Sequence, residues 1–446
     1  MPSPTINGSF PLPTSLQHIL ISFVLVSPCM HGTVTASSDL PWPNRNGPNA
    51  DGHVAATDSK GLPIKFSEDN GIEWKTKLPH FGHSTPVIGD GKIWLTAATK
   101  DGKQQFVLCV DEASGSILHQ KLLFENDAPE ILNNPVNTYA SPTCVLTEDA
   151  VYVHFGSYGT ACLNSDTAEV VWKRSDIRCR HFRGPGSSPV VFEDLLILTF
   201  DGIDAQFLTA LNIKTGKTVW RTDRSTNYKD FHHEGNPKRG GDLRKAYSTP
   251  GLIEVDGKVQ VVSMGSRAGY GYDALTGKEI WGIRHGEFNA AAPPNFYKDV
   301  VIVNTGSRKA QLRAIRLNKT TKGDVTESHE VWRRTKGNSR LSAPLLVNGR
   351  IYMVTDSGVV TCINADTGKE VWKDRLGGTH VASPITANGL IYFFSEEGEV
   401  SVIKAAAEFE IVAKNRLAEG GRASIAAAHG CLLVRSFGHL YRISGH

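Results

Sequence analysis

The chain has 446 residues with 48 basic and 45 acidic side chains, so its formal net charge is only +3. This balance gives no electrostatic reason to expect a nucleic-acid partner. Charged residues make up 21% of the chain and aromatic residues 8%. Such a composition excludes a disordered chain and suits a globular β-protein that does not span a membrane.

The first 36 residues contain no Lys, Arg, Asp or Glu. Within them, Ile19–Val26 is an apolar run interrupted only by Ser22, which is too short to cross a bilayer. Small residues at Val34-Thr35-Ala36 resemble a cleavage site. We therefore predict a signal peptide over residues 1–36 and a periplasmic or secreted protein; the alternative is a disordered tail.

Residues 37–63 form a polar lead-in rich in Pro and Gly, which contains Trp42-Pro-Asn-Arg-Asn-Gly-Pro48. One strand carrying Trp74 is then expected within Phe66–Leu78. From residue 64 to residue 446 we expect a single domain.

The segment Leu341–Trp372 shows how that domain is built. Two apolar runs are joined by Asn348-Gly349, which is a strong hairpin signal because both central residues of a type I′ turn need positive φ. Two further turns follow, Asp356-Ser-Gly358 and Asp366-Thr-Gly-Lys369. This pattern predicts four antiparallel strands, the size of one propeller blade.

The last eleven residues of this segment recur along the chain. Cys362–Trp372 has close copies at Ala210–Trp220 and Gly271–Trp281, and weaker copies at Cys162–Trp172 and Cys109–His119. Including degenerate versions, the copies close at residues 74, 119, 172, 220, 281, 332, 372 and 413. Repeats of the length that separates these closing residues, when they are rich in β-branched residues and glycine, are typical of β-propellers.

The two ends of the chain complete each other. Three strands are expected at Ala423–Ala428, Cys431–Ser436 and His439–Ser444, with no closing Trp. The strand within Phe66–Leu78 supplies the fourth, and pairing removes an open sheet edge. The fold class is therefore all-β: an eight-bladed propeller of four-stranded antiparallel blades, closed by an N-terminal strand in the C-terminal blade.

Other chemistry-bearing residues have structural explanations. Cys109, Cys162 and Cys362 occupy equivalent positions in separate blades and are expected to be buried and unbridged. Phe231-His-His-Glu234 contains metal-ligand residue types, but no third His or Cys completes a zinc set. We predict no metal site and no catalytic residues.

The repeated motif, Ala/Cys-x-Asn/Asp-x-x-Thr-Gly-Lys-x-x-Trp, resembles the tryptophan-docking motif of quinoprotein alcohol dehydrogenase-like propellers, the PQQ-like repeat family. The resemblance covers about residues 64–444. In such propellers the Trp packs between adjacent blades. The family includes PQQ-dependent dehydrogenases and non-catalytic propellers of outer-membrane protein assembly, and the chain is closer to the latter.

The resemblance also implies which features a dehydrogenase of this family would need in its cofactor site. In that branch PQQ lies on the axis over a tryptophan floor, under a vicinal disulfide and beside calcium. The sequence has no adjacent Cys pair, and Trp94 is expected to pack within its strand. We therefore expect no cofactor and a binding or scaffolding role. The alternative is a PQQ-dependent alcohol or sugar dehydrogenase with calcium and a divergent site.

Basic residues recur just before the short proline-ending motifs, such as Ser84-Thr85-Pro86, that open the blades. Equivalent places in a propeller meet at one mouth of the central channel, so these residues are the predicted site for a protein segment, peptide or anionic small molecule on a monomeric protein. They either point unpaired into the mouth, which would favour binding, or pair with nearby acids such as Asp242, Glu287 or Glu419 and neutralise one another, which would not. The predicted site consists of Arg180, His181, Arg183, Arg244, Tyr247, Arg340, His380 and Arg422.

Overall fold

The Asn-Gly turn of the repeat has the predicted geometry. Asn348 and Gly349, with φ of 48° and 72°, join β23 (Leu345–Val347) to β24 (Arg350–Val354). Positive φ at both positions is the signature of the type I′ turn. The same pair of positive φ values recurs at Asp90-Gly91, Asp256-Gly257 and Asn388-Gly389. The same type of turn therefore joins the first two strands of several blades.

The computed structural model describes residues 1–5, 39–132, 136–230, 238–307 and 309–445. Apart from its first five residues, the predicted signal peptide lies outside the described residues, as does most of Phe231–Glu234. Residues 31–446 form one compact unit. Its described residues contain eight β-sheets and three short helices: α1 (Ala56–Ser59), η1 (Gly156–Tyr158) and η2 (Lys238–Arg244).

Each sheet is one blade, and its strands follow chain order outward from the axis, except that β1 is the outer strand of blade 8 and β21 is added at the edge of blade 4. Blade 1 is β2 (Val87–Gly89), β3 (Lys92–Ala98), β4 (Gln104–Asp111) and β5 (Ile117–Glu125). Blade 2 is β6 (Val145–Leu146), β7 (Ala150–His154), β8 (Thr160–Asn164) and β9 (Val170–Arg174). Blade 3 is β10 (Val190–Phe192), β11 (Leu195–Asp201), β12 (Gln206–Asn212) and β13 (Thr218–Asp223). Blade 4 is β14 (Gly251–Val255), β15 (Lys258–Met264), β16 (Ala268–Asp273) and β17 (Glu279–Arg284), with the short β21 (Gly323–Asp324) added at its edge.

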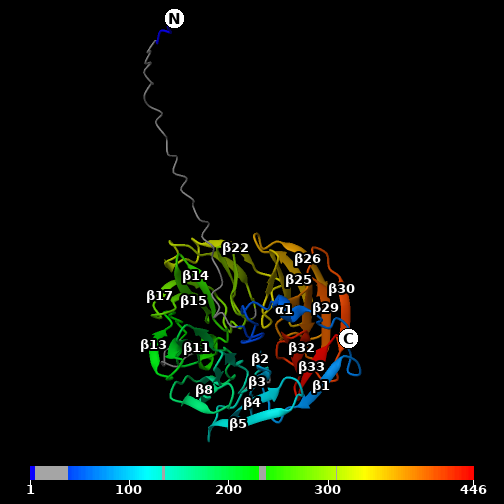
Figure 1. The fold of residues 1–446 in the computed structure, drawn as a ribbon. Coiled ribbons are helices and arrows are strands. Elements are labelled where there is room, and N and C mark those ends of the chain that lie inside the picture. The colour runs from blue at the N-terminus through cyan, green and yellow to red at the C-terminus, as the bar shows by residue number, and fades with distance from the viewer. Residues whose placement is uncertain (6–38, 133–135, 231–237, 308, 446) are drawn as a thin grey trace. The chain divides into compact units, whose positions relative to one another are not determined.

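The remaining blades follow the same order around the ring (Figure 1). Blade 5 is β18 (Asn295–Tyr297), β19 (Val300–Asn304), β20 (Leu312–Arg316) and β22 (Glu330–Arg334). Blade 6 is β23, β24, β25 (Val359–Asn364) and β26 (Glu370–Arg375). Blade 7 is β27 (Ile385–Ala387), β28 (Leu390–Phe394), β29 (Glu399–Lys404) and β30 (Ile411–Arg416). Blade 8 is β31 (Ala426–Ala428), β32 (Cys431–Arg435), β33 (His439–Ser444) and, as its outer strand, β1 (Ile72–Lys77).

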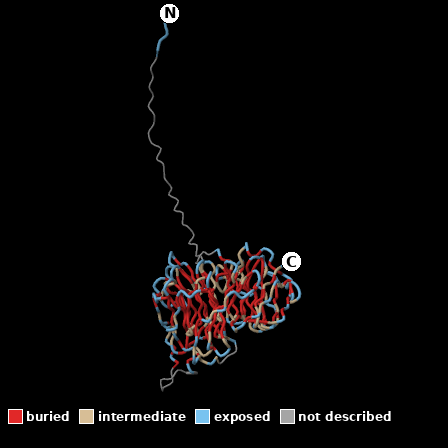
Figure 2. The backbone as a smooth tube through the Cα atoms, turned by 60° about the horizontal axis from the view of Figure 1, so that its bottom comes forward, coloured by how far each residue is buried: buried red, intermediate tan, exposed pale blue. Residues whose placement is uncertain are grey.

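The eight four-stranded blades and the scarcity of helix confirm the predicted fold class. β1 pairs antiparallel with β33, and Trp74 lies opposite Arg442. The N-terminal and C-terminal strands therefore share one sheet. Buried residues concentrate in the strands, and exposed residues lie mainly at the turns (Figure 2).

A belt of hydroxyl groups links the innermost strands around the axis. The backbone N–H of Thr85 donates to Oγ1 of Thr143 in the next blade, at 3.0 Å. Equivalent bonds connect Thr143 to Ser188, Ser188 to Thr249, Ala343 to Ser383, and Ser383 to Ser424. The small residues of the opening motifs therefore have a structural role: they connect neighbouring blades where the backbones crowd together.

The repeated tryptophans dock as the motif predicts. Nε1 of Trp172 donates to the carbonyl of Ile213 in the next blade at 2.8 Å, and a Cβ added to Gly216 would come within 2.7 Å of the Trp172 ring. The turn therefore needs glycine both for its φ of 67° and for ring clearance. Trp74, Trp220, Trp332 and Trp372 donate to the neighbouring blade in the same way.

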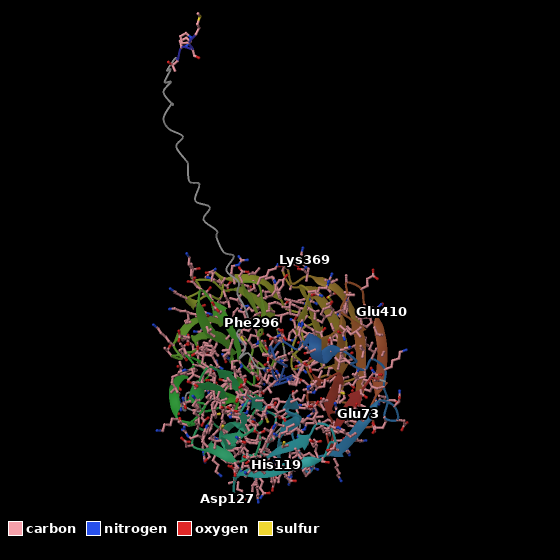
Figure 3. All side chains as sticks on the ribbon, viewed as in Figure 1. Glu73, His119, Asp127, Phe296, Lys369 and Glu410 are labelled. Atoms are coloured by element: carbon pink, nitrogen blue, oxygen red, sulfur yellow. The ribbon has the colours of Figure 1, made fainter. Side chains whose placement is uncertain are left out.

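At two of the interfaces between neighbouring blades, no tryptophan in the described part of the chain donates a hydrogen bond to the next blade. Nε1 of Trp281 donates to Gln260 of its own blade at 2.9 Å, although its ring belongs to the same buried hydrophobic cluster as Val301 and Val303 of blade 5. β21 runs parallel to β17 here and brings Gly323 opposite Trp281. At the other interface His119, on the outer strand of blade 1 (Figure 3), replaces the Trp, and the facing turn carries Ala168 instead of glycine. Without a docked indole, the turn has room for that Cβ.

The lead-in lies across one mouth of the channel, which we call the covered mouth. Trp42 is fully buried and exchanges backbone hydrogen bonds with Ile88 of β2. Further along, Val54 N–H donates to the carbonyl of Thr386 on β27 at 3.0 Å, and Asp58 accepts the backbone N–H of His429 beside β31 at 2.8 Å. α1 belongs to this crossing, which is drawn in blue in Figure 1. Residues 42–59 therefore connect blades 1, 7 and 8 before β1 joins blade 8.

Candidate functional site

The opposite mouth, which we call the basic mouth, holds a cavity of about 330 Å³. The segments that precede the innermost strands converge on it, as their equivalent positions in the repeat predict. Every blade contributes at least one lining residue, among them His83, Asn137, Arg183, Tyr247, Asn289, Arg340, Val381 and Arg422. No Asp or Glu is among the described residues that line it.

Four of the eight predicted site residues line this cavity: Arg183, Tyr247, Arg340 and Arg422. The other four do not, and they lie in the neighbouring loops. His181 is packed edge-on against Tyr247, with ring centres 5.0 Å apart, and burial lowers its pKa to about 4. His380 is buried and contacts the carbonyl of Gly377 at 2.9 Å.

Arg180 and Arg244 lie outside the lining for opposite reasons. The Arg180 side chain is 67% exposed and pairs with Glu130 at 3.1 Å. Arg244 is buried against Asp230 at 2.6 Å. Equivalent sequence positions therefore reach different depths, because the loops that carry them differ in length and conformation.

The five arginines of the prediction all have carboxylate partners. Arg183 pairs with Asp242 at 3.3 Å, as one of the two sequence-based alternatives anticipated. Arg422 pairs with Glu396 at 3.0 Å, and Arg340 pairs with Asp356. Glu287 and Glu419 are not the partners in these pairs. The alternative in which the arginines point unpaired into the mouth is therefore wrong.

The pairs nevertheless leave the cavity wall cationic. Arg183, Arg340 and Arg422 are lining residues of the cavity, whereas their partners Asp242, Asp356 and Glu396 are not. Asp242 is shared with the fully buried Lys245, and together these cations lower the pKa of Asp242 despite its partial burial. An arginine has five N–H donors, and the pairs named above use a single nitrogen of Arg183 and of Arg340. The geometry can therefore present donors to an anion inside the cavity.

Sequence reasoning missed Arg45, which reaches the same cavity from the covered mouth. Its Nη2 donates to Ser383 Oγ of the hydroxyl belt at 3.3 Å, and its buried Nη1 has no hydrogen-bond partner among the described residues. Burial lowers the pKa of Arg45 to about 10, so it remains cationic at neutral pH. The signal was present in the sequence as a lone Arg within the lead-in, but no repeat points to it.

A second buried guanidinium, that of Arg435, lies behind the cavity lining, between blades 8 and 1. Nη1 of Arg435 donates to Ser84 Oγ at 2.6 Å and to the carbonyl of Thr96 at 2.9 Å. Burial lowers its pKa to about 9. The neighbouring His83, which lines the cavity, has its pKa lowered to about 3 by burial and then by the charges of Arg435 and Arg422. The field in this wall is thus positive.

The covered mouth has a different lining. Its pocket, of about 430 Å³, lies between Pro43–His53 of the lead-in and the inner strands of blades 2 to 6. Val190, Leu252 and Phe296 contribute apolar walls, and Phe296 is labelled in Figure 3. Arg45 lines both this pocket and the basic-mouth cavity.

The cavity residues do not fit the quinone cofactor of the dehydrogenases that the repeat resembles. The described lining of the basic-mouth cavity contains no Trp to serve as a floor and no Cys. Cys109, Cys162 and Cys362 are free and buried, as predicted from their equivalent positions. Within the described residues, no cluster of three His, Cys, Asp or Glu side chains could hold a metal ion.

Among the described residues, no helix has the length and apolar character needed to cross a membrane. No curated protein matches the chain. Its fold is similar to BamB from Moraxella catarrhalis, with TM-score 0.57 and 13% identity over 83% of this chain and 99% of that one. It is also similar to the computationally designed Ika8 protein, with TM-score 0.56 and 10% identity over 82% and 98% of the two chains.

A europium-containing methanol dehydrogenase is similar in fold as well, with TM-score 0.51 and 12% identity over 90% of this chain and 91% of that one. At such identities these likenesses show the fold alone. The sequence shows which family the chain belongs to. Residues 32–181, 204–326 and 323–408 match the family described as outer membrane protein assembly factor BamB. The chain belongs to the BamB family of PQQ-like repeat propellers.

Proposed function

We propose that this chain is an exported, non-catalytic binding module that holds an anionic segment of a partner protein at its basic mouth. The family supports a binding or scaffolding role, because its name describes an assembly factor. Export rests on that family and on the charge-free segment 1–36. We propose that it acts as a monomer without a cofactor.

The observation that carries the proposal is the cavity wall itself. Arg183, Arg340 and Arg422 line one cavity on the channel axis, and their carboxylate partners lie outside the lining. Arginine suits this role because its planar fork can bind a carboxylate through two hydrogen bonds. Walls of low dielectric strengthen such contacts.

The test is calorimetric titration of the intact chain with a hexaglutamate peptide, with hexaglutamine as the uncharged control peptide. The matched variants are Arg183→Gln/Arg340→Gln at the mouth and Arg221→Gln/Arg333→Gln on the outer strands β13 and β22. Both pairs remove two ion-paired arginines. We expect hexaglutamate alone to bind, with at least about tenfold weaker affinity in the mouth variant only. Equal affinity in both variants would overturn the proposal.

The dehydrogenase alternative predicts something else: retention of PQQ by the purified chain and calcium-dependent oxidation of alcohols or sugars with a dye as acceptor. The cavity residues give no support to it, since the described lining lacks the tryptophan floor and the cysteines of that site. Stoichiometric PQQ with turnover would establish the alternative.

A further inference from the structure

Arg45 is the side chain whose position the fold leaves least explained. It belongs to the lead-in at the covered mouth, yet it is also a lining residue of the cavity at the basic mouth. The five arginines of the predicted site each pair with a carboxylate. Among the described residues Arg45 has only the hydroxyl of Ser383.

A partly buried cation with one buried, unsatisfied donor atom is costly. Removing a guanidinium from water carries a desolvation penalty that proteins normally offset with an acid or with hydrogen bonds. The buried Nη1 of Arg45 has no such partner among the described residues. A fold that needed only a plug for the channel could fill it with an apolar or amide side chain at lower cost.

The surroundings favour an anion over a neutral ligand. Arg422 and the partly buried Arg183 line the same cavity, and Arg435 lies in the wall behind His83. Small polar groups complete the lining, including Thr85, Ser141 and Ser424, so an anion would meet hydroxyl groups as well as guanidinium donors.

We infer that Arg45 is the terminal ligand contact of this channel: its guanidinium binds one carboxylate group inserted along the axis from the basic mouth. This inference rests on the proposed function and adds the residue that binds the carboxylate group of the inserted segment. The carboxylate can belong to an acidic side chain of the partner segment or to its C-terminus. It is the group that a planar guanidinium binds with two parallel hydrogen bonds.

The experiment uses the full chain and three substitutions. Arg45→Gln removes the charge and keeps hydrogen-bonding capacity, Arg45→Lys keeps the charge and removes the fork, and Lys65→Gln removes one exposed positive charge nearby in the chain. Each is titrated with hexaglutamate carrying a free C-terminus, with its C-terminal amide, and with citrate. Thermal unfolding of each variant is followed with citrate and with chloride.

We expect Arg45→Gln to weaken hexaglutamate and citrate about ten- to a hundredfold, Arg45→Lys to weaken them less, and Lys65→Gln to leave them unchanged. Without ligand, Arg45→Gln should unfold at the same temperature as the parent chain or higher. A purely structural Arg45 would instead lower that temperature and leave affinity unchanged, which would overturn the inference. A loss confined to the free C-terminus identifies the terminal carboxylate as the bound group; equal losses identify a side chain.

The outcomes separate this inference from the proposed function. Loss of binding in Arg183→Gln/Arg340→Gln but not in Arg45→Gln overturns the inference alone. Citrate binding that depends on Arg45, without binding of any acidic peptide, overturns the proposed function and supports the inference. Absence of binding by all three ligands to the parent chain overturns both.

Discussion

The two mouths of the channel are formed by opposite ends of the same eight inner strands, yet they differ in almost every physical property. At the covered mouth, the lead-in bonds to blades 1, 7 and 8 and leaves an apolar pocket. At the basic mouth, loops from every blade surround a cavity lined by guanidinium and hydroxyl groups. The repeat builds a symmetric ring, and its irregular segments make one end structural and the other suited to binding.

Removing the N-terminal segment in two steps should have the largest effect on the difference between the two mouths. A chain that begins at residue 79 lacks β1. Its β33 is then an unpaired sheet edge, so we expect aggregation. A chain that begins at residue 64 lacks the cover, including Arg45 and the buried Trp42, so we expect a soluble but less stable chain with weakened hexaglutamate binding. Light scattering and circular dichroism separate the two. A soluble chain lacking β1 with unchanged thermal stability would show that β1 does not close the ring.

The next largest effect should come from Trp42. Its ring is fully buried at the covered mouth and contacts Gly47, where an added Cβ would come within 2.8 Å of the indole. Trp42→Ala should reduce the free energy of unfolding by about 3–5 kcal/mol, the usual cost of deleting a buried aromatic side chain. Chemical denaturation measures this. A loss below about 1 kcal/mol would mean that the lead-in is not packed as part of the core.

Lowering the pH should reduce the stability of the chain in part through His83, which lines the basic mouth. Its pKa falls from 6.5 to about 3 on folding, so between these values the unfolded chain binds a proton that the native chain does not. Stability therefore falls as pH drops below about 6.5, by up to about 1.4 kcal/mol per pH unit for this one group. His83→Gln should remove that share of the slope in denaturation curves recorded between about pH 4 and pH 6. An unchanged slope would show that His83 titrates normally.

The smallest effect should follow substitution of Arg180. Its pair with Glu130 is largely exposed, and such pairs contribute about 0–1 kcal/mol. Arg180→Gln should therefore change neither stability nor hexaglutamate affinity measurably, in contrast to substitution of Arg183. A tenfold loss of affinity in Arg180→Gln would extend the site beyond the cavity.

Local rules explain what could be predicted from the sequence. Asn348-Gly349 specifies its hairpin through backbone conformation alone, and Trp172 specifies its docking through a glycine in the next copy of the repeat. Equivalence between blades places Arg183, Arg340 and Arg422 at one mouth. None of these inferences requires knowledge of a long-range partner.

The rest depends on contacts that no repeat encodes. Arg45 reaches the axis because Trp42 pairs with Ile88, from a segment without periodicity. Asp242, the partner of Arg183, comes from η2 in the irregular segment between blades 3 and 4. Trp281 bonds within its own blade where β21 runs beside it. Sequence periodicity therefore predicts the scaffold, and the irregular segments decide the charge and depth of the site.

The most direct test of the account is to find which mouth an acidic ligand occupies. A hexaglutamate peptide carrying a benzophenone group is irradiated with the intact chain, and the crosslinked residues are identified by mass spectrometry. Binding at the basic mouth should give crosslinks at apolar residues that line it, Leu341 and Val381, and excess unlabelled hexaglutamate should suppress them. Crosslinks confined to the lining of the covered mouth, such as Pro48, Leu252 and Phe296, would contradict it.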